Sequence, residues 1–212
     1  RLAKIQSAVT VCSAMCVNTT ERAGIDRDLA PHGLEANAIK TCITDLMQDA
    51  AQSLLQLCGA MGYRLDHIAG RAVVDSRPFQ IFEGSNDILY AQISESLLKQ
   101  MKVAKQENLY GFLKDYELTD RASDRLKPLL EFEVDATMPQ RKLVELGQVV
   151  SLIIALDLVI KLGERGFNPQ LIDASISSLQ QEVSGLLSSY ACDHRAGLID
   201  PYQGHPSWRD FC

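Results

Sequence analysis

The chain has 212 residues and a net charge of −6, and hydrophobic residues make up 46% of it. This length is enough for one large domain or two small ones, with ample apolar residues for a core. Charges are spread along the chain, and no run of Lys and Arg exceeds two residues. This distribution argues against nucleic acid as a partner.

The first half of the chain has helical periodicity and almost no strand signal. A first helix is expected over residues 2–23, a long second one over 34–57, a short one over 65–74 and another over 86–106. Apolar residues on the first helix follow a three- and four-residue spacing that predicts one buried face, at Leu2, Ile5, Val9, Cys12 and Cys16. The pattern predicts an all-α fold, an antiparallel helix bundle over residues 1–101.

From about residue 102 the character of the sequence changes. Charged residues cluster up to residue 133, and Pro128 interrupts a weakly amphipathic segment. Two further helices are expected over residues 140–165 and 169–190, with Asn168 as a cap for the second. The apolar stretch 143–160 contains Glu145, Gln148 and Asp157, which favours a deeply buried helix over a membrane span. Residues 102–212 are therefore interpreted as a second helical module, packed on the first or hinged to it, with an irregular last twenty residues.

The six cysteines include no CxxC pair, and the four histidines have no ligand spacing. Cys12 and Cys16 could hold a metal, but their place on the apolar stripe favours buried thiols in a reducing compartment. We expect no metal site and a cytoplasmic location. The sequence opens inside a helical repeat, without an initiator Met or a signal-peptide pattern, so we expect a piece of a longer protein.

The most informative segment runs from Phe79 to Leu89. Glu83 follows three apolar residues, Phe79, Ile81 and Phe82, and precedes Gly84. A glycine there lets a ligand approach the backbone. A carboxylate enclosed by those apolar side chains would be poorly solvated and a better base than a free Glu. The alternative is an ordinary loop in which Glu83 points into water. A helix then starts at Ser85 or Asn86, either of which can cap it, and Asp87 lies in its first turn.

A second segment ends the long helix with Gln56-Leu57-Cys58-Gly59-Ala60-Met61-Gly62-Tyr63. Its small residues let a ligand press against the backbone, and Gln56 offers both a donor and an acceptor. The alternative is a glycine helix stop with Tyr63 packing back across it.

Together, in this order and about twenty residues apart, the two segments resemble the C-terminal domain of the acyl-CoA dehydrogenases. The family strings run roughly Gln-x-x-Gly-Gly-x-Gly-aromatic and Ile-Tyr-Glu-Gly-Thr. Here Ala60 replaces the second glycine, Ser85 replaces the Thr, and Val74 replaces an Arg that commonly precedes the Asp at Asp75. The resemblance covers about residues 1–101, and residues 102–212 look like the C-terminal extension of some longer members.

The resemblance implies an FAD-dependent enzyme that converts an acyl-CoA thioester to the trans-2-enoyl-CoA. Glu83 would remove the α-proton, with Phe82 and Gly84 at the substrate. The implied FAD contacts are Ser85 and Asp87 and, across a subunit boundary, Gln56, Gly59 and Ala60. The family also implies a homo-oligomer and electron-transfer flavoprotein as the electron acceptor.

The family builds its flavin site from an N-terminal helical domain, a middle β-domain and the C-terminal bundle, and this sequence has no β-rich segment. We therefore expect a fragment that by itself neither holds FAD nor turns over substrate. Two alternatives stay open. One is a non-catalytic helical module for oligomerisation or interaction. The other is a diverged relative, such as an acyl-CoA oxidase or a flavoprotein of the DNA-damage response, although the lack of a basic patch weighs against DNA binding.

Overall fold

The structure is a computed structural model that describes residues 1–27, 29–135 and 137–192. Within these ranges the chain forms eight α-helices and three short 3-10 helices, and no strand. In chain order they are α1 (Leu2–Arg22), η1 (Ala30–His32), α2 (Gly33–Cys58), η2 (Gly59–Met61), α3 (Ile68–Ser76), η3 (Arg77–Gln80), α4 (Asn86–Ala104), α5 (Leu109–Lys114), α6 (Asp120–Leu130), α7 (Gln140–Glu164) and α8 (Pro169–Ala191). The expected all-α class is confirmed.

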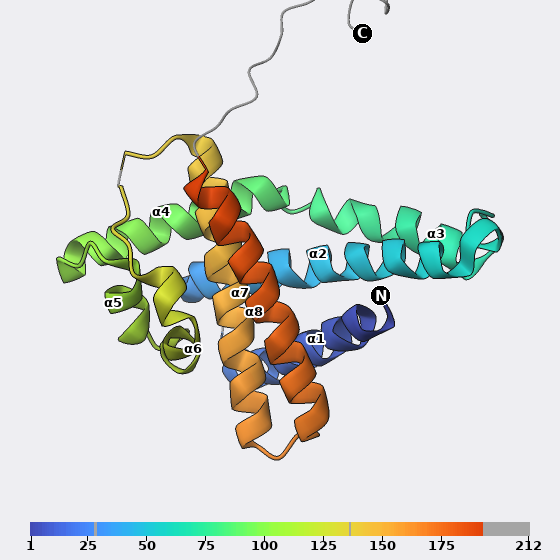
Figure 1. The fold of residues 1–212 in the computed structure, drawn as a ribbon, viewed down its shortest axis with the longest axis horizontal. Coiled ribbons are helices and arrows are strands. Elements are labelled where there is room, and N and C mark those ends of the chain that lie inside the picture. Colours follow the sequence, from blue (N-terminus) through green and yellow to red (C-terminus); the bar gives the residue numbers. More distant parts are fainter. Residues whose placement is uncertain (28, 136, 193–212) are drawn as a thin grey trace, which may run out of the picture.

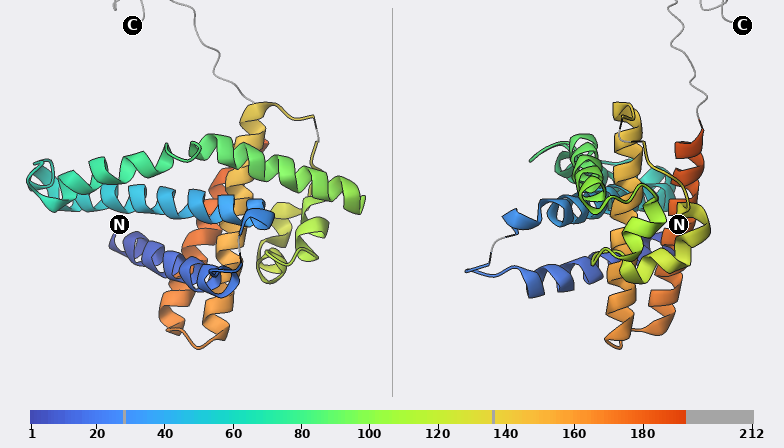
Figure 2. Two further views of the ribbon diagram at one scale, coloured as in Figure 1. Left: turned by 180° about the vertical axis from the view of Figure 1, so that it is seen from behind. Right: turned by 90° about the vertical axis from the view of Figure 1, so that its left-hand side faces the viewer.

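Helices α1 and α2 run in opposite directions, and α3 followed by α4 runs back along α2 (Figure 1). The long helix α2 packs against α1 on one side and against α3 and α4 on the other. The hairpin of α7 and α8 crosses these helices steeply, and of the two short helices α6 packs against α7 and α5 against α6 (Figure 2). The second half of the chain thus lies across the first.

Helix α7 packs against α1, α2, α4, α6 and α8. Every residue from Val149 to Val159 is buried, so this part of the helix has no solvent face. In the described ranges it is the one helix long and apolar enough to cross a membrane, yet 72% of its most apolar window is buried inside the protein. The expectation of a deeply buried helix is confirmed.

Both halves of the chain contribute to one cluster of buried apolar side chains. Met15 of α1, Ile93 of α4, Ile153 of α7 and Leu179 of α8 all belong to it. The described part of residues 102–212 is therefore packed on the first half. The division at residue 101 stays a prediction, and the last twenty residues, with His194, His205 and Cys212, lie outside the described residues.

Helices α4 and α7 cross at a glycine. A Cβ atom on Gly147 would clash with the backbone carbonyl oxygen of Tyr90, so only a residue without a side chain fits there. One turn further along α4, Ser94 Oγ donates a hydrogen bond of 2.6 Å to the carbonyl of Leu143. Helix α7 thus presses directly on the helix that begins just after Glu83.

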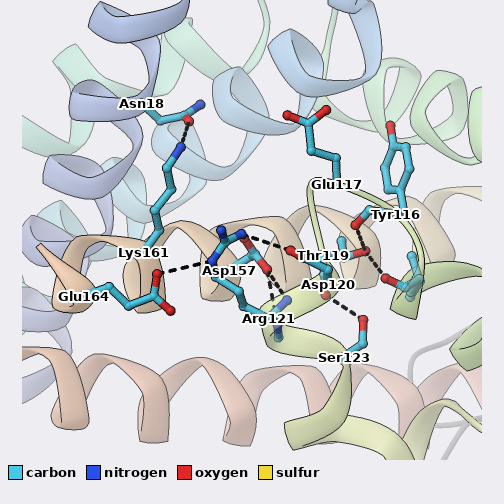
Figure 3. A network of polar contacts seen from close by, with 12 residues as sticks. Asn18, Tyr116, Glu117, Thr119, Asp120, Arg121, Ser123, Asp157, Lys161 and Glu164 are labelled. Carbon is cyan, nitrogen blue, oxygen red and sulfur yellow. Dashed lines mark hydrogen bonds and ion pairs between the residues drawn. The ribbon is translucent and has the colours of Figure 1, made fainter.

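A buried carboxylate joins α7 to α6 (Figure 3). Asp157 accepts hydrogen bonds from the backbone N–H groups of Arg121, at 2.8 Å, and Ala122, at 3.2 Å. The Arg121 side chain pairs with Asp157 at 3.4 Å and with Glu164 at 3.3 Å. Burial raises the pKa of Asp157, and the two backbone donors oppose that rise. This acid inside an apolar helix therefore satisfies first-turn donors of α6.

The buried face of α1 differs from the predicted stripe. Leu2 and Val9 are 72% and 63% exposed, and Cys16 is also exposed. The core face instead carries Val11, Ala14 and Met15, beside small and polar residues. Apolar spacing alone could not separate these faces, because both repeat with the helical period. The expectation of buried thiols is wrong for Cys16, which is exposed, and holds only in part for Cys12, which is half-buried.

The short helices α5 and α6 were not predicted. Pro128 lies inside α6, two residues before the helix ends at Leu130. A proline in the last turn costs the helix one backbone donor but does not end it at once. The contact with Asp157, far away in sequence, supports the start of this helix.

Candidate functional site

Glu83 lies in the turn between η3 and α4 and has an unusual backbone conformation. Its φ is +60°, and that of the following Gly84 is +95°. Residues with a Cβ rarely adopt positive φ, and those that do are often found at functional sites. The Glu83 side chain is exposed. The backbone conformation thus singles out the same residue as the sequence motif.

The apolar neighbours do not enclose Glu83. Phe79 and Phe82 are 56% and 67% exposed, and Ile81 is 52% exposed. Of the two interpretations of Glu83, the structure supports the one in which its carboxylate points into water, because no described segment packs over these apolar side chains. Ile81 and Phe82 instead line an open groove of about 500 Å³ together with Val73 and Val74.

Asp45 of α2 anchors both flanks of the turn. Its Oδ1 accepts hydrogen bonds from Gln80 Nε2 at 2.6 Å and from Asn86 Nδ2 at 2.5 Å. Its Oδ2 accepts one from the Tyr90 hydroxyl at 2.6 Å. Burial, followed by the charge of Asp45, raises the pKa of Tyr90, so this hydroxyl stays a proton donor. The Asp45 carboxylate therefore joins the segment before the turn, the start of α4, and the part of α4 that crosses α7.

Lys40, also on α2, reaches the turn itself. Its Nζ donates to the carbonyl oxygen of Gly84 and to Asn86 Oδ1, both at 2.9 Å. Thr44, one helical turn further on, accepts a hydrogen bond of 2.9 Å from Asn86 Nδ2. One face of α2 thus supports the turn from beneath.

The start of α4 differs from the expected cap. Ser85 is the N-cap residue, but its side chain makes no capping hydrogen bond. Asn86 is buried, and its amide bonds to α2 rather than to the α4 backbone. The expected side-chain cap is therefore absent, and Asn86 ties α4 to α2 instead. Asp87 lies in the first turn as predicted and is exposed, where negative charge is favourable.

The second predicted segment lies at the far end of α2. Gln56 is about 16 Å beyond Asp45 along the helix, at the usual rise of about 1.5 Å per residue. Gln56, Gly59 and Ala60 are all exposed, and Gly59 has a φ of +57° at the helix end. Tyr63 is 83% exposed, so it does not pack back across this end. The chain does not bring this segment to Glu83.

Lys40, Asp45 and Tyr90 were not predicted from the sequence as part of the site. The available signal was a set of polar residues at helical spacing on an otherwise apolar helix, namely Lys40, Thr41, Thr44, Asp45 and Gln48. Such a row predicts buried hydrogen bonds. It does not reveal the partners, which lie some forty residues away.

A separate cavity of about 490 Å³ lies between α1, α2 and α8, and Lys4, Asp49 and Glu182 are among its lining residues. Partial desolvation, with the charge of Asp45, raises the pKa of Asp49. Partial desolvation, with the charge of Asp49, likewise raises the pKa of Glu182. Within the described part of the chain, no three His, Cys, Asp or Glu residues are grouped so as to hold a metal ion.

Comparison with known families gives a match to the family model described as acyl-CoA dehydrogenase, C-terminal domain, over residues 1–98. No curated protein matches the chain. The family match includes both predicted segments and the Lys40–Asp45 support, and it ends within α4. Helices α5 to α8 lie outside it.

Proposed function

Because residues 1–98 match the model of the acyl-CoA dehydrogenase C-terminal domain, we propose that Glu83 is the base of a flavin-dependent α,β-dehydrogenation of an acyl-CoA thioester. The observation that carries this proposal is the Glu83 turn. A carboxylate with positive φ, supported by α2 and exposed beside open apolar surface, lies inside the range that matches the family.

The proposed chemistry assigns two tasks to the turn. The Glu83 carboxylate takes the α-proton of the thioester, and the product is the trans-2-enoyl-CoA. The backbone N–H of Glu83 makes no backbone hydrogen bond within the described residues and can polarise the thioester carbonyl. The chemistry that FAD would supply, when bound, is acceptance of the β-hydride. Phe82 and Gly84 lie beside the base, where we propose that they contact the acyl group.

An exposed carboxylate is a weak base for such a proton, so water has to be excluded when substrate binds. Phe79 and Phe82 are already exposed on the free surface of the turn. We propose that the substrate, the flavin and segments outside the described residues cover these rings. The bare apolar surface is therefore part of the proposed site.

FAD is the cofactor that this family uses, and the available side chains suit it. Ser85 Oγ makes no hydrogen bond within the described residues, and Asp87 is exposed in the first turn of α4. The end of α2 carries three exposed residues, Gln56, Gly59 and Ala60. They lie too far from Glu83 to contact the same end of one cofactor as Glu83 does. This separation supports a homo-oligomer in which they meet the adenine end of a neighbour's FAD. Electron-transfer flavoprotein as the electron acceptor is proposed from the family alone.

We further propose that the 212-residue chain by itself is a catalytically incomplete piece. The open surface around Glu83 supports this, and the absorption spectrum of the purified chain tests it. We expect no flavin bands, and stoichiometric bound flavin would contradict the proposal. A cytoplasmic location is proposed from the cysteines, since Cys12, Cys42 and Cys58 are free thiols.

The decisive experiment is Glu83→Gln in a full-length enzyme that contains this chain. The substitution keeps the shape of the side chain and removes the base, so kcat should fall by about 10²- to 10⁴-fold. Glu95→Gln, at an exposed position on α4, is the matched control and should leave kcat unchanged. Near-normal activity of Glu83→Gln would rule out Glu83 as the base.

A further inference from the structure

We propose that Lys40 is a positioning residue that holds the peptide after Glu83 in the orientation needed for proton abstraction. This proposal rests on the proposed role of Glu83 as the base. It assigns to Lys40 no contact with substrate or cofactor.

Lys40 acts on the turn more directly than any other described side chain. It is half-buried, and its ammonium group donates to the Gly84 carbonyl oxygen at 2.9 Å. Asp45 holds Gln80 and Asn86 on either side, but within residues 81–85 no other described side chain bonds to the backbone. A hydrogen bond from a charged donor is about twice as strong as one between neutral groups.

The turn needs such a contact because packing does not hold it. Phe79, Ile81 and Phe82 are all more than half exposed, so apolar burial contributes little to its shape. Gly84 can adopt positive and negative φ with similar ease, whereas Glu83 pays a steric cost at its φ of +60°. Once Gly84 is released, we expect Glu83 to relax to negative φ. The carboxylate would then leave its position relative to the α-proton.

The first test uses the chain itself and a protease that cleaves after Glu. Cleavage at Glu83–Gly84 is measured by mass spectrometry relative to cleavage after Glu133, which is also exposed. Lys40→Met should raise this ratio about tenfold, because a charged hydrogen bond to the turn is lost. Lys40→Arg, which keeps a charged donor, should restore most of the protection.

The matched control for this test is Lys161→Met. Lys161 is another half-buried lysine, and it donates to the side chain of Asn18 at 3.3 Å, away from the turn. The Lys161→Met substitution should leave the cleavage ratio unchanged. If Lys40→Met leaves the ratio unchanged, or raises cleavage after both glutamates equally, Lys40 does not position the turn and the proposal fails.

The second test uses the full-length enzyme. Lys40→Met should lower kcat about 10- to 100-fold with KM within about threefold, because misplacing a catalytic group costs the chemical step more than binding. Lys40→Arg should recover most of kcat. A Lys40→Met enzyme with normal kcat would overturn the positioning role and leave Glu83 as base. Near-normal activity of Glu83→Gln would instead overturn the base assignment, whatever the protease shows.

Discussion

The two ends of the segment from Phe79 to Leu97 are stabilised in opposite ways. At the turn, Phe79 and Phe82 are exposed, and polar contacts from α2 provide the order. Further along α4, Ile93 and Leu97 are fully buried, and the backbone of α7 comes so close that Gly147 is required. A few residues along one helix thus separate an open surface from a sealed core.

This difference shows how the chain can keep apolar surface free without losing its shape at the site. Polar anchors such as Lys40 and Asp45 approach the turn from beneath and leave the outer face of the aromatic rings uncovered. Apolar packing would have ordered the turn only by covering those rings. An ordered but uncovered surface suits a site that a ligand and other segments complete.

The sharpest way to break this comparison is to truncate one apolar side chain in each region. Ile153→Ala in α7 should lower the free energy of unfolding by about 4 kcal/mol, because it leaves a cavity in a fully buried site. Phe82→Ala in the turn should change it by less than about 0.5 kcal/mol, because the ring is already in water. Urea unfolding of the chain measures both. A large loss from Phe82→Ala would show that the turn is packed after all.

The next prediction tests the tight crossing of α4 and α7. Gly147→Ala should lower the free energy of unfolding by about 3 kcal/mol, because the added Cβ meets the Tyr90 carbonyl and forces the helices apart. Gly185→Ala in α8 is the matched control, since a Cβ there meets nothing within 4 Å. The control should be neutral or stabilising by up to about 1 kcal/mol. Equal losses from both would argue against a close crossing.

The same contrast explains what the sequence could predict. Five long helices follow from strong periodicity, and the observed α1, α2, α4, α7 and α8 match the expected spans to within about two residues. The helices α5 and α6 were missed because they are short and polar, and α6 depends on Asp157, thirty-six residues from Arg121. The prediction of which face of α1 is buried was wrong, because two faces repeat with the helical period and the helices that pack against α1, such as α7, decide between them.

At the candidate site, the sequence singled out Glu83 but did not predict what surrounds it. Glu83 and Gly84 stand out in a short motif, and their positive φ values agree with a special role. The sequence could not decide whether Phe79 and Phe82 enclose Glu83, because the burial of a side chain depends on what packs over it and not on its own polarity. The hydrogen bond from Lys40 to Gly84 was not predicted, because its acceptor is a backbone carbonyl, and every residue type has one.

A smaller effect is expected at the buried acid that joins α6 to α7. Asp157→Ala should lower the free energy of unfolding by about 2 kcal/mol, because two backbone N–H groups of α6 lose their acceptor. Asp173→Ala, at an exposed position on α8, should change it by less than about 0.5 kcal/mol. Hydrogen exchange should show the loss concentrated in residues 120–130. If the Asp157→Ala variant kept the same protection along α6, Asp157 would not be the acceptor that stabilises the start of this helix.

The smallest predicted effect is a pH dependence at the contact between α2 and α8. The pKa values of Asp49 and Glu182 are raised in the folded chain, first by desolvation and then by a neighbouring carboxylate, Asp45 for Asp49 and Asp49 for Glu182, while the charge of Lys4 opposes both shifts. The folded state therefore binds more protons than the unfolded state. Its stability should fall as the pH rises from about 4, the unfolded pKa of such carboxyls, through the raised folded values.

Replacing Asp49 tests this directly. Asp49→Asn should flatten the fall in stability over that window and make the chain more stable at pH 7, by less than about 1 kcal/mol because both carboxyls keep contact with solvent. Asp66→Asn is the control of opposite sign, since the hydrogen bond from Arg64 lowers the pKa of Asp66. The contribution of Asp66 to stability is present above its unfolded pKa and is lost as the pH falls. Removing this carboxylate should therefore not stabilise the chain at pH 7. Urea unfolding at pH 4, 5.5 and 7 distinguishes the two, and a lower stability of Asp49→Asn at pH 7 would show that Asp49 supports the helix contact as an anion.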